Sequence, residues 1–462
     1  MLFRSDEALL DEVTALVERP NVLIGRFEEA FLAVPQECLI LTMKANQKYF
    51  PLLNAQGKLT HRFLLVSNIS PQDASAVIGG NERVVRPRLS DAKFFFDQDR
   101  KRSLESRVPG LDKVVYHNRL GSQGERSARL SALAGSLGRA LGDEQLAQQA
   151  QRAARLAKTD LLTDMVGEFP ELQGIMGSYY AMHDGLGQDI AWAIEDHYKP
   201  RFAGDSLPRE TLGLVVAMAD KLETLVGLFG IGSLPTGDKD PFALRRHALG
   251  VIRMLIEAGM PLALDEVLGL AHTAFEPWLA RQESEIRDQF ARHQVALVEF
   301  IDERLAGSLR EQGYSALEVD AVLALRPRLL SDIPPRLAAV RAFAALPEAP
   351  ALAAANKRIG NILKKAGDVD PHVSTVLLQD AAEVALHQAM QQVVQLADRQ
   401  FEDGDYAASL QTLAALRGPV DAFFDGVMVN AQEMDIRLNR QGLLKVLHLA
   451  MNRVADLSRL AN

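Results

Sequence analysis

The sequence has 462 residues, and its 51 basic and 60 acidic side chains give a formal net charge of −9 at pH 7. Hydrophobic residues make up 48% and charged residues 24%, which is typical of a soluble globular protein and excludes disorder along the whole chain. The acidic balance also excludes a protein that binds nucleic acid indiscriminately through a surface of lysine and arginine, although local basic patches stay possible. The length predicts roughly three domains.

The sequence carries no signal for a membrane or for export. No apolar run approaches the roughly 20 residues that a membrane-spanning helix needs. The first residues, MLFRSDEALLDEV, turn acidic at once and lack the apolar core of a secretion signal. The single cysteine, Cys38, cannot form an internal disulfide. We therefore expect a cytoplasmic protein that does not cross a membrane.

The first 115 residues are expected to form a partial α+β domain. Short runs rich in β-formers alternate with turn residues, and a helix is expected at Asp91–Phe96, continuing from Pro87. Because strands begin almost at once, this region is interpreted as the tail of a longer domain. The expected strands are Val22–Ile24, Cys38–Thr42, Tyr49–Leu53 and Phe63–Asn68, with a turn at Asn54–Lys58.

From about Gly121 onward the pattern is helical, so the fold as a whole is expected to be mainly α. Breaks rich in Gly and Pro occur at 227–241, 332–335 and 347–350. They divide the rest into an all-helical region at 121–330, a linker at 331–349 and a helical bundle at 350–462. Three apolar stripes at helical spacing predict core positions: Leu146, Ala150, Ala153 and Ala157; Leu378, Ala382, Ala385, Ala389, Val393 and Leu396; and Leu444, Leu447, Met451, Val454 and Leu457.

Two N-terminal segments have the composition of a nucleic-acid contact. KANQKYF, residues 44–50, combines cations for phosphates with amides and rings for bases, which makes Lys44, Asn46, Lys48 and Tyr49 candidates. An ordinary strand edge explains the same residues. The stretch Glu82–Arg107 has eight basic and five acidic residues, and a solvated helix face accounts for it as well as an RNA contact does.

The helical middle contains part of a metal-binding pattern. Metal-dependent phosphohydrolases of the HD type hold divalent cations with histidines and aspartates on neighbouring helices. The dipeptide His183–Asp184 precedes two glycines and is expected in a turn, and the other alignment, at Thr159–Asp160, lacks the histidine. Asp160, His197 and Asp220 are therefore interpreted as degenerate positions with no metal. An HD-type metal-dependent phosphohydrolase stays as the alternative function.

The C-terminal region carries the clearest basic segment. NKRIGNILKK, residues 356–365, has four basic residues and no acid, and a helix would turn its apolar residues inward. The later stretch 417–434 leads to two arginines that are expected to reach a ligand together with Asn430. This composition suits RNA phosphates and unstacked bases, although a solvated face is the alternative. The candidates are Lys357, Arg358, Asn361, Lys364, Lys365, Asn430, Arg437 and Arg440.

Several common catalytic motifs are missing from the sequence. It contains no GxxxxGK[ST] phosphate loop, no GxGxxG and no CxxC pair. It also contains neither HIGH nor KMSKS, and no arginine-bearing motif of a class II synthetase is apparent. Nothing in the chain is therefore expected to activate an amino acid.

Five segments together resemble one family over essentially all of the chain. They are RPNVLIGRFEEAFLAVPQECLILTMKANQKYFPL, EFPELQGIMGSYYA, DHYKPRFAGDSLP, ADKLETLVGLFGIGSLPTGDKDPFALRRHALGVIRML and LRGPVDAFFDGVMVNAQEMDIRLNR. In this order they resemble the glycyl-tRNA synthetase beta subunit of bacterial tetrameric enzymes. The resemblance implies a noncatalytic tRNA-binding subunit of glycine-tRNA ligase. It also implies an alpha subunit that carries the active site for ATP, Mg and glycine, a complex of two alpha and two beta chains, and no cofactor in this chain.

The resemblance also implies a role for each region. Residues 1–115 would be part of an editing-like domain similar to that of the phenylalanyl enzyme, and 121–330 a degenerate HD-like domain. Residues 350–462 would be an anticodon-binding bundle similar to that of arginyl-tRNA synthetase. The family's beta subunit has a substantial region before RPNVLIGRF that this sequence mostly lacks, so the resemblance implies a C-terminal fragment.

Overall fold

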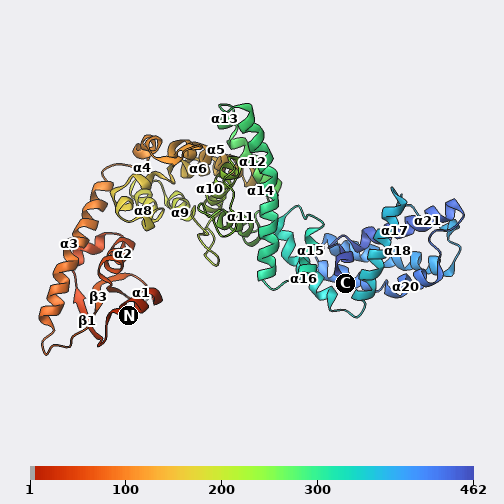
Figure 1. The fold of residues 1–462 in the computed structure, drawn as a ribbon, viewed down its shortest axis with the longest axis horizontal. Coiled ribbons are helices and arrows are strands. Elements are labelled where there is room, and N and C mark those ends of the chain that lie inside the picture. Colours follow the sequence, from red (N-terminus) through yellow and green to blue (C-terminus); the bar gives the residue numbers. More distant parts are fainter. Residues whose placement is uncertain (1–5, 462) are drawn as a thin grey trace. The chain divides into compact units, whose positions relative to one another are not determined.

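The computed structural model describes residues 6–461, and the mainly α fold that the sequence predicts is confirmed (Figure 1). The chain divides into two compact units. Unit 1 comprises Met1–Glu223 and Leu270–Arg281, and unit 2 comprises Thr224–Gly269 and Gln282–Asn462. The boundaries of the four regions predicted from the sequence stay predictions.

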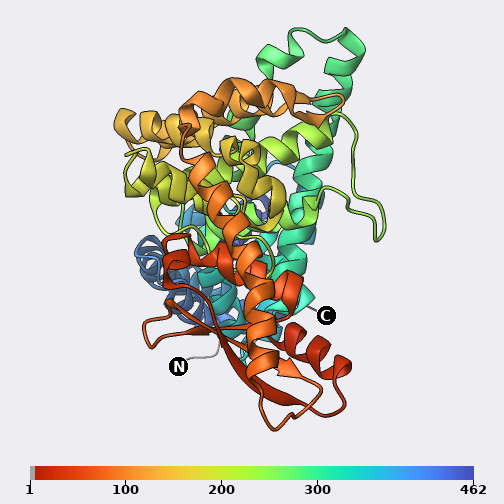
Figure 2. The same cartoon turned by 90° about the vertical axis from the view of Figure 1, so that its left-hand side faces the viewer.

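Unit 1 begins with a small antiparallel sheet in the strand order β1-β3-β2 (Figures 1 and 2). The predicted strand at Cys38–Thr42 is wrong, because these residues lie in helix α2. Cys38, Leu39, Thr42 and Met43 are buried there at helical spacing, which a short apolar run cannot distinguish from a buried strand. The elements are α1 (Glu7–Leu16), β1 (Asn21–Arg26), η1 (Glu29–Ala33), α2 (Gln36–Gln47), β2 (Phe50–Leu53), β3 (Leu59–Ser67) and α3 (Ser75–Asp99).

The two faces of this sheet are covered differently. On one face Leu9 and Val13 of α1 form a small core with Phe50, against which Leu64 and Val66 of β3 pack. On the other face Phe63 is fully buried, and a Cβ at Gly25 would lie 2.4 Å from its ring. Glycine is therefore required at this point of β1. Helix α3 contacts β1 as well.

The rest of unit 1 is a group of short helices. Helices α5 and α6 make the most extensive contact, and a capping box between Ser122 and Glu125 begins α5. The elements are α4 (Leu104–Arg107), η2 (Val108–Lys113), β4 (Val115–His117), β5 (Gly121–Ser122), α5 (Gln123–Leu141), α6 (Glu144–Leu156), η3 (Thr159–Leu162), α7 (Asp164–Glu168), η4 (Pro170–Leu172), α8 (Ile175–His183), α9 (Gln188–Asp196), α10 (Thr211–Gly230, which continues into unit 2) and α13 (Glu276–Leu279).

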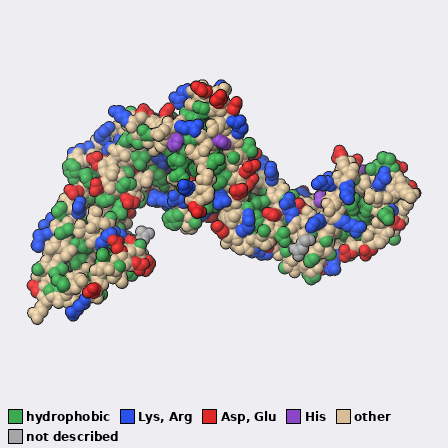
Figure 3. Space-filling model, viewed as in Figure 1, with side chains coloured by type: hydrophobic (Ala, Val, Ile, Leu, Met, Phe, Trp, Pro, Cys, Tyr) green, Lys and Arg blue, Asp and Glu red, His purple; other side chains and the backbone are tan. Residues whose placement is uncertain are grey.

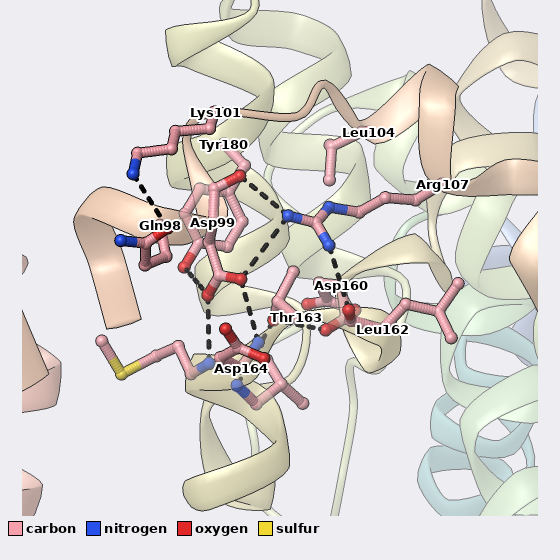
Figure 4. Close-up of polar contacts among 12 residues, drawn as sticks. Gln98, Asp99, Lys101, Leu104, Arg107, Asp160, Leu162, Thr163, Asp164 and Tyr180 are labelled. Carbon is pink, nitrogen blue, oxygen red and sulfur yellow. Dashed lines mark hydrogen bonds and ion pairs between the residues drawn. The ribbon is translucent and has the colours of Figure 1, made fainter. Parts of the chain in front are cut away.

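A buried carboxylate at the end of α3 joins the sheet region to these helices (Figure 4). Asp99 is 3% exposed and accepts hydrogen bonds from the backbone N–H groups of Asp164 and Met165, at 2.9 and 3.0 Å. It also accepts one from the Tyr180 hydroxyl at 2.8 Å, and Arg107 donates to its backbone carbonyl at 2.8 Å. These bonds hold the beginning of α7, which directly follows the η3 turn that contains Asp160.

The regular elements of unit 2 are helices, apart from one isolated β-bridge between Thr236 and Lys239 among the described residues. Its elements are α11 (Leu244–Glu257), α12 (Leu264–Ala274, which continues into unit 1), α14 (Ser284–Glu311), α15 (Ala316–Leu323), η5 (Leu330–Asp332), α16 (Ile333–Ala344), α17 (Ala349–Ala366), η6 (Thr375–Leu377), α18 (Ala381–Glu402), α19 (Tyr406–Ala414), α20 (Arg417–Gly426), α21 (Met434–Met451) and η7 (Leu457–Leu460). Segment 331–349, predicted as a linker, contains α16. This helix buries Leu337, Val340 and Phe343 and packs against α15 and α19. Pro334 and Pro335 therefore mark the beginning of a helix and not an extended connection.

The predicted apolar stripes meet different outcomes. Ala150, Ala153 and Ala157, and the whole C-terminal stripe that begins at Leu444, are buried as predicted, whereas Leu146 of the first stripe is only half-buried. The middle stripe is wrong: Leu396 is 49% exposed, and α18 instead buries the face that carries Glu383 and Met390. Because α18 carries alanines on several faces, the sequence does not indicate which face is buried. The buried ion pair between Glu383 and Arg440 fixes that face.

No single helix within residues 6–461 is long and apolar enough to span a membrane. The neighbouring segments Leu330–Ala344 and Ala349–Ala366 reach such a length and apolar composition only when taken together, and they are bent by 111° relative to each other.

Candidate nucleic-acid interface

A cleft of about 870 Å³ lies between helices α17 and α21 in unit 2. The connection from α20 to α21 closes one side of it through Asn430. The other lining residues come from the two helices: Ala354, Lys357, Arg358, Asn361, Ile362, Lys365 and Ala366 from α17, and Met434, Arg437, Leu438 and Gln441 from α21.

The lining of this cleft is basic and contains no carboxylate. Four of its residues are cations: Lys357, Arg358, Lys365 and Arg437. The Arg358 guanidinium lies 4.2 Å from the centre of the Phe424 ring, a stacking contact that orients it. The Lys357 ammonium donates to the Ala461 carbonyl at 3.4 Å. The cleft therefore attracts phosphate anions without an acidic residue in its lining to oppose them.

The same cleft contains groups that suit bases. Ile362, Met434 and Leu438 supply apolar surface, and Met434 and Leu438 are 62% and 49% exposed. Side-chain amides, which both donate and accept hydrogen bonds, come from Asn361, Asn430 and Gln441. Unstacked bases need both an apolar face and hydrogen-bonding groups. Figure 3 shows Lys and Arg side chains beside hydrophobic ones over the C-terminal helices.

Helix α17 forms for local reasons that the sequence shows. Pro350 lies in its first turn, where proline needs no hydrogen-bond partner, and Gly367 ends it with φ +86°. Leu352, Ile359 and Leu363 are buried on one face. The cations on the opposite face are left exposed to solvent.

A buried polar network fixes α17 against α21. The Asn356 side chain is fully buried and exchanges hydrogen bonds of 2.8 and 3.1 Å with that of Asn452. His448 Nδ1 lies 2.9 Å from Asn356 Oδ1, and burial lowers the pKa of this imidazole. The two reciprocal hydrogen bonds between these amides form only at one alignment of α17 along α21. The network therefore determines which residues of the two helices face the cleft.

Arg440 is not free to reach a ligand, and this part of the sequence prediction is wrong. Its side chain is 6% exposed and forms ion pairs with Glu383 and Asp380 of the α18 N-terminus. It also donates to the Met428 carbonyl at 2.7 Å. Arg440 therefore holds the connection that carries Asn430, and it acts as a positioning residue.

The structure brings together six of the C-terminal candidates. Lys357, Arg358, Asn361, Lys365, Asn430 and Arg437 all line the cleft. Lys364 is exposed on α17 but lies outside the lining. The sequence reasoning missed Met434, Leu438 and Gln441. Their spacing of three and four residues with Arg437 places all four on one face of α21, and that period was the available signal.

The N-terminal candidates do not form a similar surface. The Lys44 ammonium forms an ion pair of 2.9 Å with Asp6, and that of Lys48 forms one of the same length with Glu12. Tyr49 is 5% exposed, and its hydroxyl donates to Asn81 at 2.6 Å. Burial raises the pKa of this hydroxyl. Asn46 is exposed. The two cations thus attach α1 to the end of α2, and Tyr49 belongs to the core.

The degenerate positions Asp160, His197 and Asp220 lie in the interior of unit 1. Asp160 accepts hydrogen bonds from the backbone N–H groups of Gly174 and Gly177, so it caps the start of α8. Burial raises its pKa to about 6. His197 is fully buried at the end of α9, and burial lowers its pKa well below the ordinary value.

Asp220 is neutralised by basic side chains of the chain itself. Its carboxylate forms ion pairs of 3.0 Å with both Lys158 and Arg126. Burial alone would raise the Asp220 pKa, but the charges of Lys158 and Arg126 hold it well below the ordinary value. Burial lowers the pKa of Lys158 to about 8. A second carboxylate, Glu223, pairs with Arg126 and with Arg129.

These residues do not fit a divalent metal. Across residues 6–461 no group of three His, Cys, Asp or Glu side chains could hold a metal ion. The Lys158 ammonium contacts the Asp220 oxygen where a metal would have to bind, and Asp160 is engaged in capping a helix. The geometry therefore does not favour the HD-type phosphohydrolase.

Comparison with known proteins bears on both regions. Residues 2–324 match the family model described as glycyl-tRNA synthetase beta subunit. Residues 352–457 match the model described as the DALR anticodon binding domain. This chain belongs to the glycyl-tRNA synthetase beta subunit family. The second match contains nearly all of α17 and the whole of α21, so both walls of the cleft lie inside it.

Curated members of the glycyl-tRNA synthetase beta subunit family are closely similar to the chain. The glycine–tRNA ligase beta subunit of Polaromonas naphthalenivorans (strain CJ2) is 71% identical over 98% of this chain. Those of Paracidovorax citrulli (strain AAC00-1) and Dechloromonas aromatica (strain RCB) are 70% and 69% identical over 99% of it. The chain spans 63% of the length of each of these relatives.

Proposed function

We infer that this chain binds the tRNA for glycine, and that it does so as part of the beta subunit of glycine-tRNA ligase. The observation that carries this proposal is the α17–α21 cleft. Its lining has four cations, three amides and no carboxylate, and it lies within the match to the anticodon binding domain. A protein with an overall charge of −9 needs such a local basic surface to bind RNA at a defined place.

Each class of lining residue has a separate task in this proposal. Lys357, Lys365 and Arg437 contact phosphates of the anticodon loop, which gives affinity without reading sequence. Asn361, Asn430 and Gln441 form hydrogen bonds with the edges of unstacked bases. The apolar side chains of Met434 and Leu438 contact the faces of those bases.

The chain contributes to the ligase by positioning its substrate. The aminoacylation site, with ATP and Mg, belongs to the separate alpha subunit, and two alpha and two beta chains form the complex in the cytoplasm. A bound and oriented tRNA presents its 3′ end to that site. A misplacement of about 1 Å costs on the order of 100-fold in rate, so positioning alone makes the beta subunit necessary.

The salt dependence of tRNA binding tests the proposal. The structure supplies a matched pair of neighbouring lysines on α17, because Lys365 lines the cleft and Lys364 does not. The slope of log K against log salt is negative, and loss of one phosphate contact reduces its magnitude by about 0.7 to 0.9. We expect Lys365→Gln to weaken binding of a glycine tRNA transcript and to reduce this magnitude by that amount. Lys364→Gln should leave both nearly unchanged. Equal effects of the two variants would contradict the assignment of the cleft.

A further inference from the structure

Among the described residues, Arg358 is the only cation of the α17–α21 cleft lining that lies over an aromatic ring. Its guanidinium carbon is 4.2 Å from the centre of the Phe424 ring. Phe424 belongs to α20, which packs against α17 (Figure 1). It meets the ring of the fully buried Phe423 edge-on, with 5.5 Å between the ring centres. These contacts connect Arg358 to the core and limit the movement of its guanidinium.

The two sides of this guanidinium have different surroundings. Phe424 covers one side and is not part of the cleft lining, whereas Arg358 is. The opposite side of the guanidinium is therefore turned toward the cleft. Within residues 6–461 Arg358 forms no ion pair with a carboxylate, so no acidic side chain of the described chain draws it away from this position.

The neighbours of Arg358 on α17 suit a flat ligand group. Ala354 and Ile362 lie four positions before and after Arg358, so they line the cleft on the same side of the helix. Asn361, three positions after Arg358, adds a side-chain amide to the same lining. A planar group that lies on the guanidinium therefore meets apolar surface at its sides and an amide at its edge, which is the combination that an unstacked base needs.

We propose that Arg358 stacks on an unstacked base of the bound tRNA, so that the base, the guanidinium and the Phe424 ring form successive layers. This rests on the proposed function, because the base belongs to the anticodon loop that the same cleft holds. Arg358 thereby has a task different from the phosphate contacts of the other three cations. Every base has a face for stacking, but a base inside a paired stem does not expose it. Arg358 therefore selects single-stranded loop nucleotides over helical RNA.

Two other tasks of Arg358 predict different behaviour. A guanidinium that contacts a phosphate can be replaced by the ammonium of a lysine, which binds phosphate as a point charge. A guanidinium that only covers the Phe424 ring contributes to the stability of the contact between α17 and α20 and not to RNA affinity. Stacking on a base needs a flat, delocalised cation, and lysine does not supply one.

The variant Arg358→Lys tests the proposal with the charge kept constant. We expect it to bind a glycine tRNA transcript about tenfold more weakly, the loss of one stacked base. The slope of log K against log salt should keep its magnitude, because no phosphate contact is lost. Arg437→Lys is the matched comparison, since Arg437 lines the same cleft but lies over no ring among the described residues. It should lose clearly less affinity than Arg358→Lys.

A second variant tests the layer behind the guanidinium. Phe424→Leu keeps an apolar side chain on α20 but removes the ring that orients Arg358. It should weaken tRNA binding in the same way as Arg358→Lys, again with an unchanged salt slope. Because both changes disrupt one stack, the double variant should bind no more weakly than the weaker of the two single variants.

Transcripts with a single abasic nucleotide identify the stacked base. Each position of the anticodon loop is made abasic in turn, and the affinity is measured for the unchanged chain and for Arg358→Lys. At one position the unchanged chain should lose about tenfold in affinity. Arg358→Lys should add no further loss there, because the base that the guanidinium covers is already absent.

Three results would overturn this assignment of Arg358. An affinity loss in Arg358→Lys no larger than that in Arg437→Lys would assign Arg358 to a phosphate. A lowered thermal unfolding midpoint with unchanged tRNA affinity would assign it to packing alone. Additive losses at every abasic position would exclude a contact with a base. If Lys365→Gln still weakens tRNA binding, these results overturn the stacking alone; no binding by the unchanged chain would overturn the proposed function with it.

Discussion

Replacing Arg440 with methionine removes one buried guanidinium and leaves its partner in place. Glu383 is fully buried and accepts two further hydrogen bonds, from the backbone N–H groups of Gln379 and Asp380, at 2.7 and 2.9 Å. The Arg440→Met variant therefore retains a buried carboxylate without its main counter-ion. It also removes the hydrogen bond to the Met428 carbonyl, which holds the connection between α20 and α21.

The expected loss of stability follows from these contacts. Removing one partner of a buried ion pair costs about 3 to 5 kcal/mol. The two remaining backbone bonds to Glu383 place the loss near the lower value, about 3 kcal/mol. The Asp380 carboxylate is half exposed, so its share is below about 1 kcal/mol. The double variant with Glu383→Gln should recover part of the loss, because no buried charge then lacks a partner.

Hydrogen exchange measured on peptides from 427–451 reports this change in the unit where it occurs. Tryptophan fluorescence does not, because both tryptophans, Trp192 and Trp278, lie in unit 1. A loss of about 3 kcal/mol corresponds to exchange about 100-fold faster through local opening. The variant should also bind tRNA more weakly with an unchanged salt slope, since Arg440 positions the connection and contacts no phosphate.

Two results would refute this reasoning. A loss below about 1 kcal/mol would show that the pair contributes little to the fold. A decrease of about 0.7 to 0.9 in the magnitude of the slope of log K against log salt would show that Arg440 itself contacts a phosphate.

Three further predictions concern other parts of the chain. Asp160→Asn keeps an oxygen that can accept from the Gly174 N–H, but the amide cannot ionise. The Asp160 pKa of about 6 in the folded chain lies above the ordinary value of about 3.9 in the unfolded chain. The contribution of the Asp160 carboxyl to the free energy of unfolding is therefore fully present below pH 4 and is lost as pH rises through 6. Urea unfolding should therefore show wild type losing about 2 to 3 kcal/mol relative to Asp160→Asn between pH 4 and pH 7, and a constant difference would contradict the burial argument. Gly442→Ala places a Cβ 2.3 Å from the His372 carbonyl oxygen, so thermal unfolding should show a loss of about 1 to 3 kcal/mol, whereas an unchanged midpoint would mean that the 370–372 loop moves freely. Tyr49→Phe removes the hydrogen bond to Asn81 and should cost about 1 kcal/mol with no effect on tRNA binding; reduced tRNA affinity would restore Tyr49 as an RNA contact.

The sequence predicted the parts of the fold that depend on local pattern. Strands β1, β2 and β3 and the turn at Asn54–Lys58 follow from β-formers and turn residues, and Gly57 has the positive φ that such a turn needs. The basic face of α17 could also be predicted, because helical period and an absence of acids are visible in the letters alone. The segment 38–42 could not, since a short apolar run fits a buried helix as well as a strand.

The other errors arise where a distant partner decides the outcome. In the sequence Arg440 has the composition of an exposed ligand contact. In the structure it pairs with Glu383, which lies 57 positions earlier. The orientation of α18 depends on the same pair, because its alanines do not distinguish one face from another. Lys158 lies 62 positions before Asp220 in the sequence, and its ammonium forms an ion pair with the Asp220 carboxylate. A lysine therefore neutralises the carboxylate that an HD-type pattern would assign to a metal. Pairs of this kind are set by tertiary packing, which single-sequence periodicity does not encode.

The measurement that tests the central claim most directly is binding of the purified chain to a glycine tRNA transcript beside the same transcript with a substituted anticodon. Both are measured across one salt series. The α17–α21 cleft predicts tighter binding to the native anticodon, and it predicts that Lys365→Gln and Asn430→Ala reduce this difference while Lys364→Gln preserves it. Equal affinity for the two transcripts, or a preference that survives both cleft variants, would contradict the account.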